Sequence, residues 1–419
     1  MMITSFESED FRNVSCASLD FERINVLIGP NNAGKSNFIR ALSFAANMVN
    51  NTQKEESTGF LSQLKQNGWN SVTNRRSDTP SFKLMWHFLL NGQPVKYTLR
   101  ANVSARRDGN YITEEALDAA QPGAGHNKAF NYFRCHTPEV GIGQFSRAGM
   151  SRTKNYLQYA KVDKQESVLL QMDSLFFENK EMFSNIFARD EIRKVLESMR
   201  TYFKGFYSYA CTSFDLAAIR TMQDEQNDGN YLKKNGANFV NVFSDACMDD
   251  PEFKPRYLRE LRRLIRECED LKIERAGGKI WMELKMNGYW FPLAEVSDGT
   301  IHLLLLMLML NLPECRGISL LAIDEPEMNL HPAWQKLLAN ELMSCRSFTQ
   351  CFVSTHSPDF LDELTEGFLT GEVAVFVFDP SSKMPIRKLN RDALVDDLQS
   401  WTLGDLYRVA DPAIGGWPQ

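Results

Sequence analysis

The segment Gly29-Pro30-Asn31-Asn32-Ala33-Gly34-Lys35-Ser36 contains a glycine, four free positions, a second glycine, a lysine and a serine. Such a loop turns its backbone N–H groups toward a phosphate chain at the positive end of a helix. The apolar run 24–28 before it predicts a buried strand, and residues 37–46 after it carry apolar side chains at helical spacing. This strand, turn and helix predict an α/β fold that binds a nucleoside triphosphate.

The side chains of this loop supply the first candidate ligands. Lys35 is placed to reach the β- and γ-phosphates, and the Ser36 hydroxyl is placed to ligate magnesium. Asn32, Gly34 and Asn37 complete the candidate nucleotide-binding set in this part of the chain. The predicted ligands are therefore ATP and Mg²⁺.

Two later strands end in polar side chains. Residues 317–323 form an apolar run, followed by Asp324 and Glu325, and residues 350–354 form another, followed by His356. At the carboxyl edge of a parallel sheet, Asp324 is suited to hold magnesium and Glu325 to orient or deprotonate the attacking water. His356 lies where a γ-phosphate would be, so we assign it a phosphate-sensing role. Glu325 and His356 are the predicted catalytic residues.

A second candidate anion site precedes the apolar run 301–311. Ser297-Asp298-Gly299-Thr300 combines a serine and a glycine with the start of a predicted helix. One chain cannot easily fold both this segment and the first loop onto one triphosphate. We therefore expect a second copy of the chain to supply Ser297 and Gly299.

The order of these motifs resembles the ABC-type ATPases of the SMC/RecF/OLD group, in its AAA_21-like branch. The resemblance covers residues 1–45 and 275–380, and it includes three short segments: Ile323-Asp324-Glu325-Pro326-Glu327, Asn329-Leu330-His331-Pro332 and Ser354-Thr355-His356-Ser357-Pro358. Thr300 stands where the group's signature loop usually has glutamine. The resemblance implies that Arg12 lies near the phosphates, that 329–332 contacts the dimer partner, and that His356 is the switch histidine.

The group also implies a head-to-tail dimer with two ATP molecules at its interface, closed by ATP and opened by slow hydrolysis. A glutamine that helps to ligate magnesium is expected in the middle region, where Gln144, Gln165 and Gln171 are all candidates. The OLD nucleases of this group carry a TOPRIM domain after the ATPase. The residues after His356 are too few for that domain, so we expect any nuclease to be a separate protein.

The predicted architecture is α/β. A P-loop ATPase head with a mixed sheet is expected from residues 1–50 and 276–385, joined by an insertion over 51–275. The insertion is predicted to comprise a β meander at 80–118, a mobile loop at 121–152 and a helical lobe at 160–272, and a C-terminal tail follows at 386–419. Asn91-Gly92 and Asn287-Gly288 predict hairpins.

Composition narrows the functional class. A net charge of −6 indicates no global nucleic-acid surface. The arginines within 255–272 fit either a phosphate-binding stripe or a solvated face, and the interspersed glutamates favour the solvated face. Eight cysteines without zinc spacing, and no signal-peptide pattern, predict reduced thiols in the cytoplasm. The apolar run 303–310 is too short to span a membrane and predicts a buried helix.

The leading hypothesis is an ATPase whose ATP-dependent dimerisation controls a separate effector, such as a nuclease or toxin. Stand-alone ATPases of this kind resemble those of anti-phage defence systems such as Septu and PARIS. A RecF-like DNA-binding repair ATPase is the alternative, and salt-sensitive DNA binding would favour it. A third possibility is a scaffold that binds ATP with negligible turnover.

Overall fold

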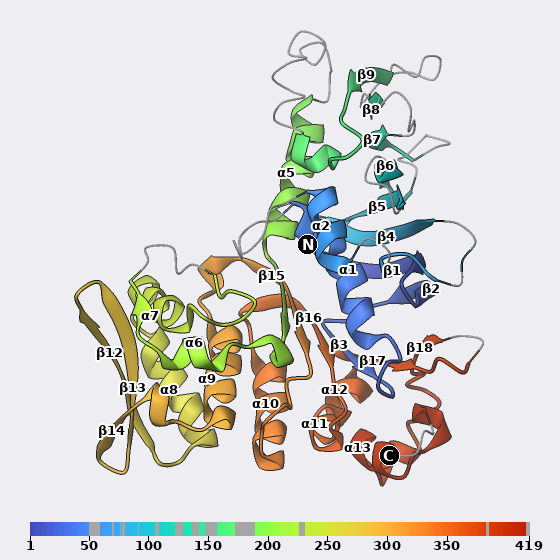
Figure 1. Ribbon diagram of the computed structural model, residues 1–419. Coiled ribbons are helices and arrows are strands. Elements are labelled where there is room, and N and C mark those ends of the chain that lie inside the picture. The colour runs from blue at the N-terminus through green and yellow to red at the C-terminus, as the bar shows by residue number, and fades with distance from the viewer. Residues whose placement is uncertain are drawn as a thin grey trace.

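The computed structural model describes most of the chain: residues 1–49, 59–68, 71–75, 77, 80–90, 92–104, 109–121, 129–135, 142–146, 157–171, 189–225, 231–382 and 385–415. Within these residues, three sheets and the helices around them form a layered α/β structure, as predicted (Figure 1).

The central sheet has six strands in the order β10-β15-β16-β3-β17-β18. Five of them run parallel and only β18 is antiparallel to its neighbour. Because parallel strands share one carboxyl edge, the polar residues that follow β15, β16 and β3 come together there. The strands are β3 (Ile24–Ile28), β10 (Phe206–Ala210), β15 (Ile318–Asp324), β16 (Phe348–Ser354), β17 (Val373–Phe378) and β18 (Ile386–Lys388).

The second sheet is antiparallel and has eight strands in the order β2-β1-β4-β5-β6-β7-β8-β9. The hairpin predicted at 91–92 is confirmed, because β4 and β5 pair up to Leu90 and Gln93. The strands are β1 (Met2–Phe11), β2 (Val14–Asp20), β4 (Ser81–Leu90), β5 (Gln93–Asn102), β6 (Tyr111–Ala119), β7 (Asn131–Cys135), β8 (Ile142–Ser146) and β9 (Leu157–Lys161).

The predicted loop at 121–152 is wrong for two of its parts. Residues 131–135 and 142–146 are the strands β7 and β8. Residues 121, 129 and 130 are also described, and the other residues of the predicted loop lie outside the described part of the chain. The composition of β7 and β8 gives little strand signal, but β6 offers an open edge to β7, and β7 offers one to β8. Pairing with an existing edge, rather than local propensity, forms these strands.

Helix α1 (Lys35–Val49) lies between the two sheets, and its buried face joins both to one core. The Trp86 indole of β4 donates to the Leu42 carbonyl of α1 at 3.0 Å. The fully buried Gln350 of β16 exchanges hydrogen bonds with the Ile3 backbone of β1, at 3.1 and 2.9 Å. Helices α2 (Phe60–Asn67) and α5 (Arg189–Lys204) also contact α1.

The opposite face of the central sheet is covered by a group of helices and a small third sheet. Helix α9 (Asp298–Asn311) is buried along its whole length from Thr300 to Leu310, which confirms the predicted buried helix. The other elements here are α6 (Leu216–Arg220), α7 (Phe239–Asp249), α8 (Phe253–Leu264), α10 (Pro332–Ser344), α11 (Pro358–Asp362), α12 (Thr365–Thr370), β11 (Gln223–Asp224), β12 (Cys268–Ala276), β13 (Lys279–Met286) and β14 (Tyr289–Pro292). The β13–β14 pairing confirms the second predicted hairpin.

The predicted helical lobe at 160–272 is wrong where it contains strands: residues 160–161 end β9, and residues 223–224 are β11. Residues 206–210 are β10, an edge strand of the central sheet whose side chains alternate onto its two faces, and β12 already begins at Cys268. The arginines of α8 are engaged within the chain: Arg263 pairs with Glu260 and Glu341, and Arg256 pairs with Asp250. These ion pairs, with Arg263 53% exposed, agree with the solvated face that the interspersed glutamates favoured.

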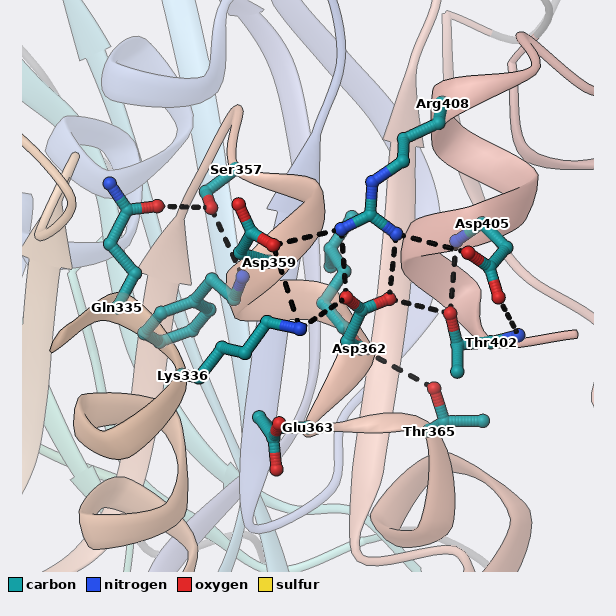
Figure 2. Close-up of polar contacts among 12 residues, drawn as sticks. Gln335, Lys336, Ser357, Asp359, Asp362, Glu363, Thr365, Thr402, Asp405 and Arg408 are labelled. Carbon is teal, nitrogen blue, oxygen red and sulfur yellow. Dashed lines mark hydrogen bonds and ion pairs between the residues drawn. The ribbon is translucent and has the colours of Figure 1, made fainter. Parts of the chain in front are cut away.

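The predicted tail contributes β18 and the helix α13 (Leu403–Arg408), which packs on α11. A Cβ at Gly404 would lie 2.1 Å from the Pro358 carbonyl oxygen, so only glycine allows this approach. Arg408 pairs with Asp359 at 2.9 Å and with Asp362 at 2.8 Å (Figure 2).

None of the helices that the structure describes is long and apolar enough to cross a membrane.

Glu115 of β6 is a buried carboxyl group at the centre of the antiparallel sheet. It accepts hydrogen bonds from the Tyr97 hydroxyl at 2.9 Å, the Ser167 hydroxyl at 2.8 Å and the Val168 N–H at 2.9 Å. Burial raises the pKa of Glu115 above its ordinary value of 4.5, and the hydrogen bonds only oppose this.

This raised pKa predicts how stability depends on pH. Because the folded protein holds the Glu115 proton more tightly than the unfolded chain, the associated stability is present below pH 4.5 and is lost as pH rises through the folded pKa. In the wild type, the free energy of unfolding should therefore fall by up to about 1.4 kcal/mol per pH unit over this range. We expect E115Q to lack this dependence on pH. Urea unfolding from pH 4.5 upward measures it, with the partly exposed Glu114→Gln as control; equal slopes in wild type and E115Q would contradict the prediction.

Candidate nucleotide site

The loop between β3 and α1 has the backbone shape that its two glycines permit. Gly29 has φ 150° and a Cβ there would lie 2.5 Å from the Phe378 carbonyl oxygen. Gly34 has φ 109° and a Cβ there would lie 2.9 Å from the Asn13 side chain. Asn32 adopts φ 62°, a left-handed conformation that asparagine tolerates. The loop is therefore a narrow turn at the start of a 15-residue helix.

Lys35 is folded back into this loop. Its Nζ donates to the carbonyl oxygens of Gly29 at 2.8 Å and Pro30 at 3.2 Å, and lies 2.8 Å from His356 Nε2. Burial lowers the pKa of Lys35, opposed by three nearby carboxylates, Glu325, Asp324 and Glu327. The ammonium thus sits in the mouth of the phosphate loop on weak neutral acceptors that phosphate oxygens would replace.

The first turn of α1 carries no acidic side chain to oppose a bound phosphate. Ser36 is its second residue, and Asn37 donates to the Asn13 side chain at 2.7 Å. Arg12, in the turn between β1 and β2, donates to Asn37 Oδ1 at 3.3 Å and to the Asn67 carbonyl at 2.7 Å. Burial and then Arg40 lower the pKa of Arg12. The structure therefore brings Arg12 to the first turn of the phosphate-loop helix.

The two carboxylates, Asp324 and Glu325, lie at the carboxyl end of β15. Asp324 lies opposite Ser354 of β16 in the strand register and accepts a hydrogen bond from the Ser354 hydroxyl. Glu325 has φ 56°, unusual for a residue other than glycine, and its N–H donates to the Ser354 carbonyl at 3.1 Å. This conformation turns the Glu325 carboxylate to within 3.9 Å of His356 Nε2.

His356 follows β16 and faces the same point. Burial and the adjacent Lys35 lower its pKa to about 4, with Asp324 opposing them. At neutral pH the imidazole is therefore uncharged and Nε2 can accept a hydrogen bond from the lysine. Lys35, Asp324, Glu325 and His356, which the sequence placed in one site, are brought together by β3, β15 and β16.

The Ser297–Thr300 segment lies elsewhere. Ser297 caps α9 by accepting from the Thr300 N–H at 3.2 Å, and a Cβ at Gly299 would lie 2.6 Å from the Asn329 carbonyl oxygen. Helix α9 packs on the face of the central sheet opposite α1, as the two cores show. The three atoms nearest to a Cβ at Gly299 belong to Asn329 and Trp334, in and after the loop that follows Glu325.

A protein-family model described as "AAA domain, putative AbiEii toxin, Type IV TA system" matches residues 24–147 and 188–362, which is most of the chain. The chain belongs to this family, AAA_21. The matched ranges of this AAA_21 protein include the phosphate loop, both carboxylates and His356. A search of curated proteins finds no match.

Among solved structures, this AAA_21 protein is similar to an SMC head bound to the C-winged helix domain of ScpA. The identity is 12% and the TM-score 0.51, over 94% of this chain and 99% of that one. The SMC head domain from Thermotoga maritima is 13% identical, with a TM-score of 0.43 over 93% of this chain and 98% of that one. The family and the SMC-head fold together identify an ABC-type P-loop ATPase of the SMC/RecF group.

Magnesium fits the oxygen groups that this AAA_21 site offers. Ser36, on α1, and Asp324, at the carboxyl end of β15, are oxygen donors of the kind that Mg²⁺ prefers. Among the described residues, no three His, Cys, Asp or Glu side chains form a metal cage. Such an ion would thus need phosphate and water oxygens to complete its shell.

The position of the glutamine loop stays open. Gln165 donates to the Asn110 carbonyl at 3.3 Å, and Gln171 donates to the Asp163 carbonyl at 2.8 Å. Both therefore serve local turns beside the antiparallel sheet. Gln144 is on β8, near the far end of that sheet from β1, and its side chain is outside the described residues.

The sequence assigned no role to two residues that bind the chain at His356 and Ser357 in this AAA_21 protein. Glu327 Oε1 accepts from the His356 N–H at 2.6 Å. Gln335 Oε1 accepts from the hydroxyl of the next residue, Ser357, at 2.5 Å (Figure 2). A second glutamate so soon after Glu325 was the available signal for Glu327. Nothing in the sequence pointed to Gln335.

Proposed function

We propose that the protein binds ATP with magnesium, hydrolyses it slowly, and uses ATP to close a head-to-tail dimer. One observation carries this proposal. The Ser297–Thr300 segment begins a buried helix on the face of the central sheet opposite the helix of the phosphate loop. This placement supports the proposal that a second copy of the chain, rather than the same chain, presents the segment to the phosphates.

Within one chain, the residues divide the chemistry between them. Lys35 leaves the Gly29 and Pro30 carbonyls and binds the β- and γ-phosphates. Ser36 and Asp324 would hold magnesium, which when bound neutralises charge on the phosphate oxygens. Glu325 orients the attacking water, and phosphoryl transfer needs little beyond such positioning and charge stabilisation.

The neutral His356 ring accepts from Lys35 while the site is empty. When phosphate takes the lysine, the ring is released, and in its Nε2–H tautomer it can donate a hydrogen bond to a γ-phosphate oxygen instead. His356 thereby distinguishes the two states of the site. The partner's Ser297 and Gly299 complete the site from the other side, and its helix α9 directs a positive end to the phosphates.

We propose further that this cycle controls a separate effector, a nuclease or toxin, in cytoplasmic anti-phage defence. The family description names a putative toxin of a toxin–antitoxin system, and the related SMC head carries a bound partner domain. The α8 arginines are paired within the chain, which favours a protein partner over DNA. Co-purification with the product of the neighbouring gene tests this role, and salt-sensitive DNA binding would favour the RecF-like alternative.

The shared site predicts complementation between two inactive variants. S297R should bind ATP normally but lose turnover, because the arginine blocks the partner's phosphates, and K35A should not bind ATP at all. In an equimolar mixture each heterodimer keeps one intact site, so ATPase activity should return to about a quarter of the wild-type rate.

Phosphate release by each variant alone and by the mixture measures this. S297A is the matched control, because it removes the same helix cap, worth roughly 1 kcal/mol, without the bulk of arginine. A mixture as inactive as its components, with both folded and S297R binding ATP, would contradict the shared site.

A further inference from the structure

Two loops run side by side at the carboxyl edge of the central sheet. One follows β15 and extends from Asp324 to the dimer-contact loop, residues 329–332; the other follows β16 and contains His356. They are joined where they leave the sheet, because the Glu325 N–H donates to the Ser354 carbonyl at 3.1 Å. Two further links lie beyond this point.

The first link is the Glu327 carboxylate, which accepts from the His356 N–H at 2.6 Å. This N–H belongs to the residue whose ring meets Lys35, so the hydrogen bond sets the position of the ring through its own backbone. The other carboxylate oxygen, Oε2, is closed off from solvent and has no hydrogen-bond partner in the described part of the chain. Glu327 is buried beside two other acids, and its polar contacts there include the His356 N–H and the hydroxyl of the preceding residue, Thr355.

The second link is Gln335, in the first turns of α10. Its Nε2 donates to the Leu330 carbonyl at 2.9 Å, and its Oε1 accepts from the Ser357 hydroxyl at 2.5 Å (Figure 2). One side chain therefore joins the dimer-contact loop to the residue after His356. Asn329 in that loop has φ 60°, and its carbonyl lies against Gly299 of the signature segment.

We propose that Glu327 is a positioning residue for ATP turnover, which holds the main chain of His356 and transmits to it the position of the dimer-contact loop. Gln335 supports it as a second link. When a partner chain presses on residues 329–332, both links move the backbone of residues 356–357, and the ring shifts relative to Lys35 and Glu325. The inference rests on the proposed function for its effect on turnover, but its structural part does not.

Burial raises the pKa of Glu327, and the hydrogen bond needs an acceptor oxygen rather than a charge. Glutamine keeps that oxygen and leucine of similar size lacks it. E327L should therefore displace His356, whereas E327Q should hold it. Q335L removes the second link, together with a 3.4 Å hydrogen bond to the Glu327 carbonyl, but leaves the Glu327 carboxylate on the His356 N–H, so it should displace His356 less.

The test has two readouts in the full-length protein. In nucleotide-free samples labelled at histidine, the His356 ring signal, assigned with H356Q, should shift in E327L, shift less in Q335L and stay unchanged in E327Q. In the ATPase assay, E327L should lower turnover at least about 30-fold with ATP affinity within about threefold, since small misplacements of catalytic groups cost this much. E327Q should restore turnover to within about threefold of wild type.

E363L is the matched control, because Glu363, at the end of α11, accepts from Asn340 at 2.8 Å and forms no hydrogen bond or ion pair with His356 in the described part of the chain. An unchanged His356 signal in folded E327L and Q335L would overturn the inference. So would equal losses of turnover in E327L and E327Q. If wild-type protein hydrolyses no ATP while the ring signal shifts as expected, the proposed function fails and the link through Glu327 stands.

Discussion

Lys35→Ala is expected to weaken ATP binding at least about 100-fold, because a charge-assisted contact to two phosphate groups is lost from a buried site. Lys35 is 6% exposed and is the ammonium that the structure places in the mouth of the loop. Its pKa is lowered by burial, so the empty site disfavours the charge and the variant should fold.

Titration calorimetry with ATP and magnesium measures the affinity. Lys336→Ala is the matched control, because Lys336 pairs with Asp359 and Asp362 on the helices behind the site. That variant should bind ATP as wild type does. Unchanged ATP affinity in K35A would refute the assignment of the phosphate loop.

Glu325→Gln is expected to keep ATP affinity within about threefold and to lower turnover at least about 100-fold, since water positioning acts only on the reaction step. The change preserves shape, and the strained backbone at φ 56° is set by hydrogen bonds to Ser354 that glutamine retains. With turnover blocked, ATP should remain bound and the dimer should stay closed.

Single-turnover phosphate release and nucleotide retention on a desalting column measure these two effects. Glu366→Gln, an exposed change on α12, is the matched control and should behave as wild type. Normal hydrolysis by E325Q would place the catalytic base elsewhere in the site.

The elements that the sequence predicted well are those whose signal is local. Helix α9 is buried on all sides, and β4 and β5 pair up to the two residues on either side of the predicted turn, Leu90 and Gln93, so each carries its own pattern. The strands β7 and β10 were missed because pairing with another strand, rather than a local pattern, forms them: β6 supplies an edge for β7, and β15, far along the chain, supplies one for β10.

The residues of the site also fall into those that a sequence motif reveals and those that only the fold brings together. Lys35, Asp324 and Glu325 follow from motif chemistry, because a phosphate needs a cation and magnesium needs oxygen ligands. The contact between Glu327 and the His356 backbone joins residues 29 apart, and no side-chain pattern encodes a bond to a main-chain N–H. Only the adjacent ends of β15 and β16 bring them together.

Whether ATP closes a dimer can be read from the molar mass of E325Q by light scattering. Without nucleotide the protein should have the mass of one chain, 48.0 kDa, and with ATP and magnesium it should have twice that mass. The double variant S297R/E325Q should bind ATP and remain at 48.0 kDa. The proposal would be contradicted if E325Q saturated with ATP kept the mass of one chain, or if the double variant dimerised equally well.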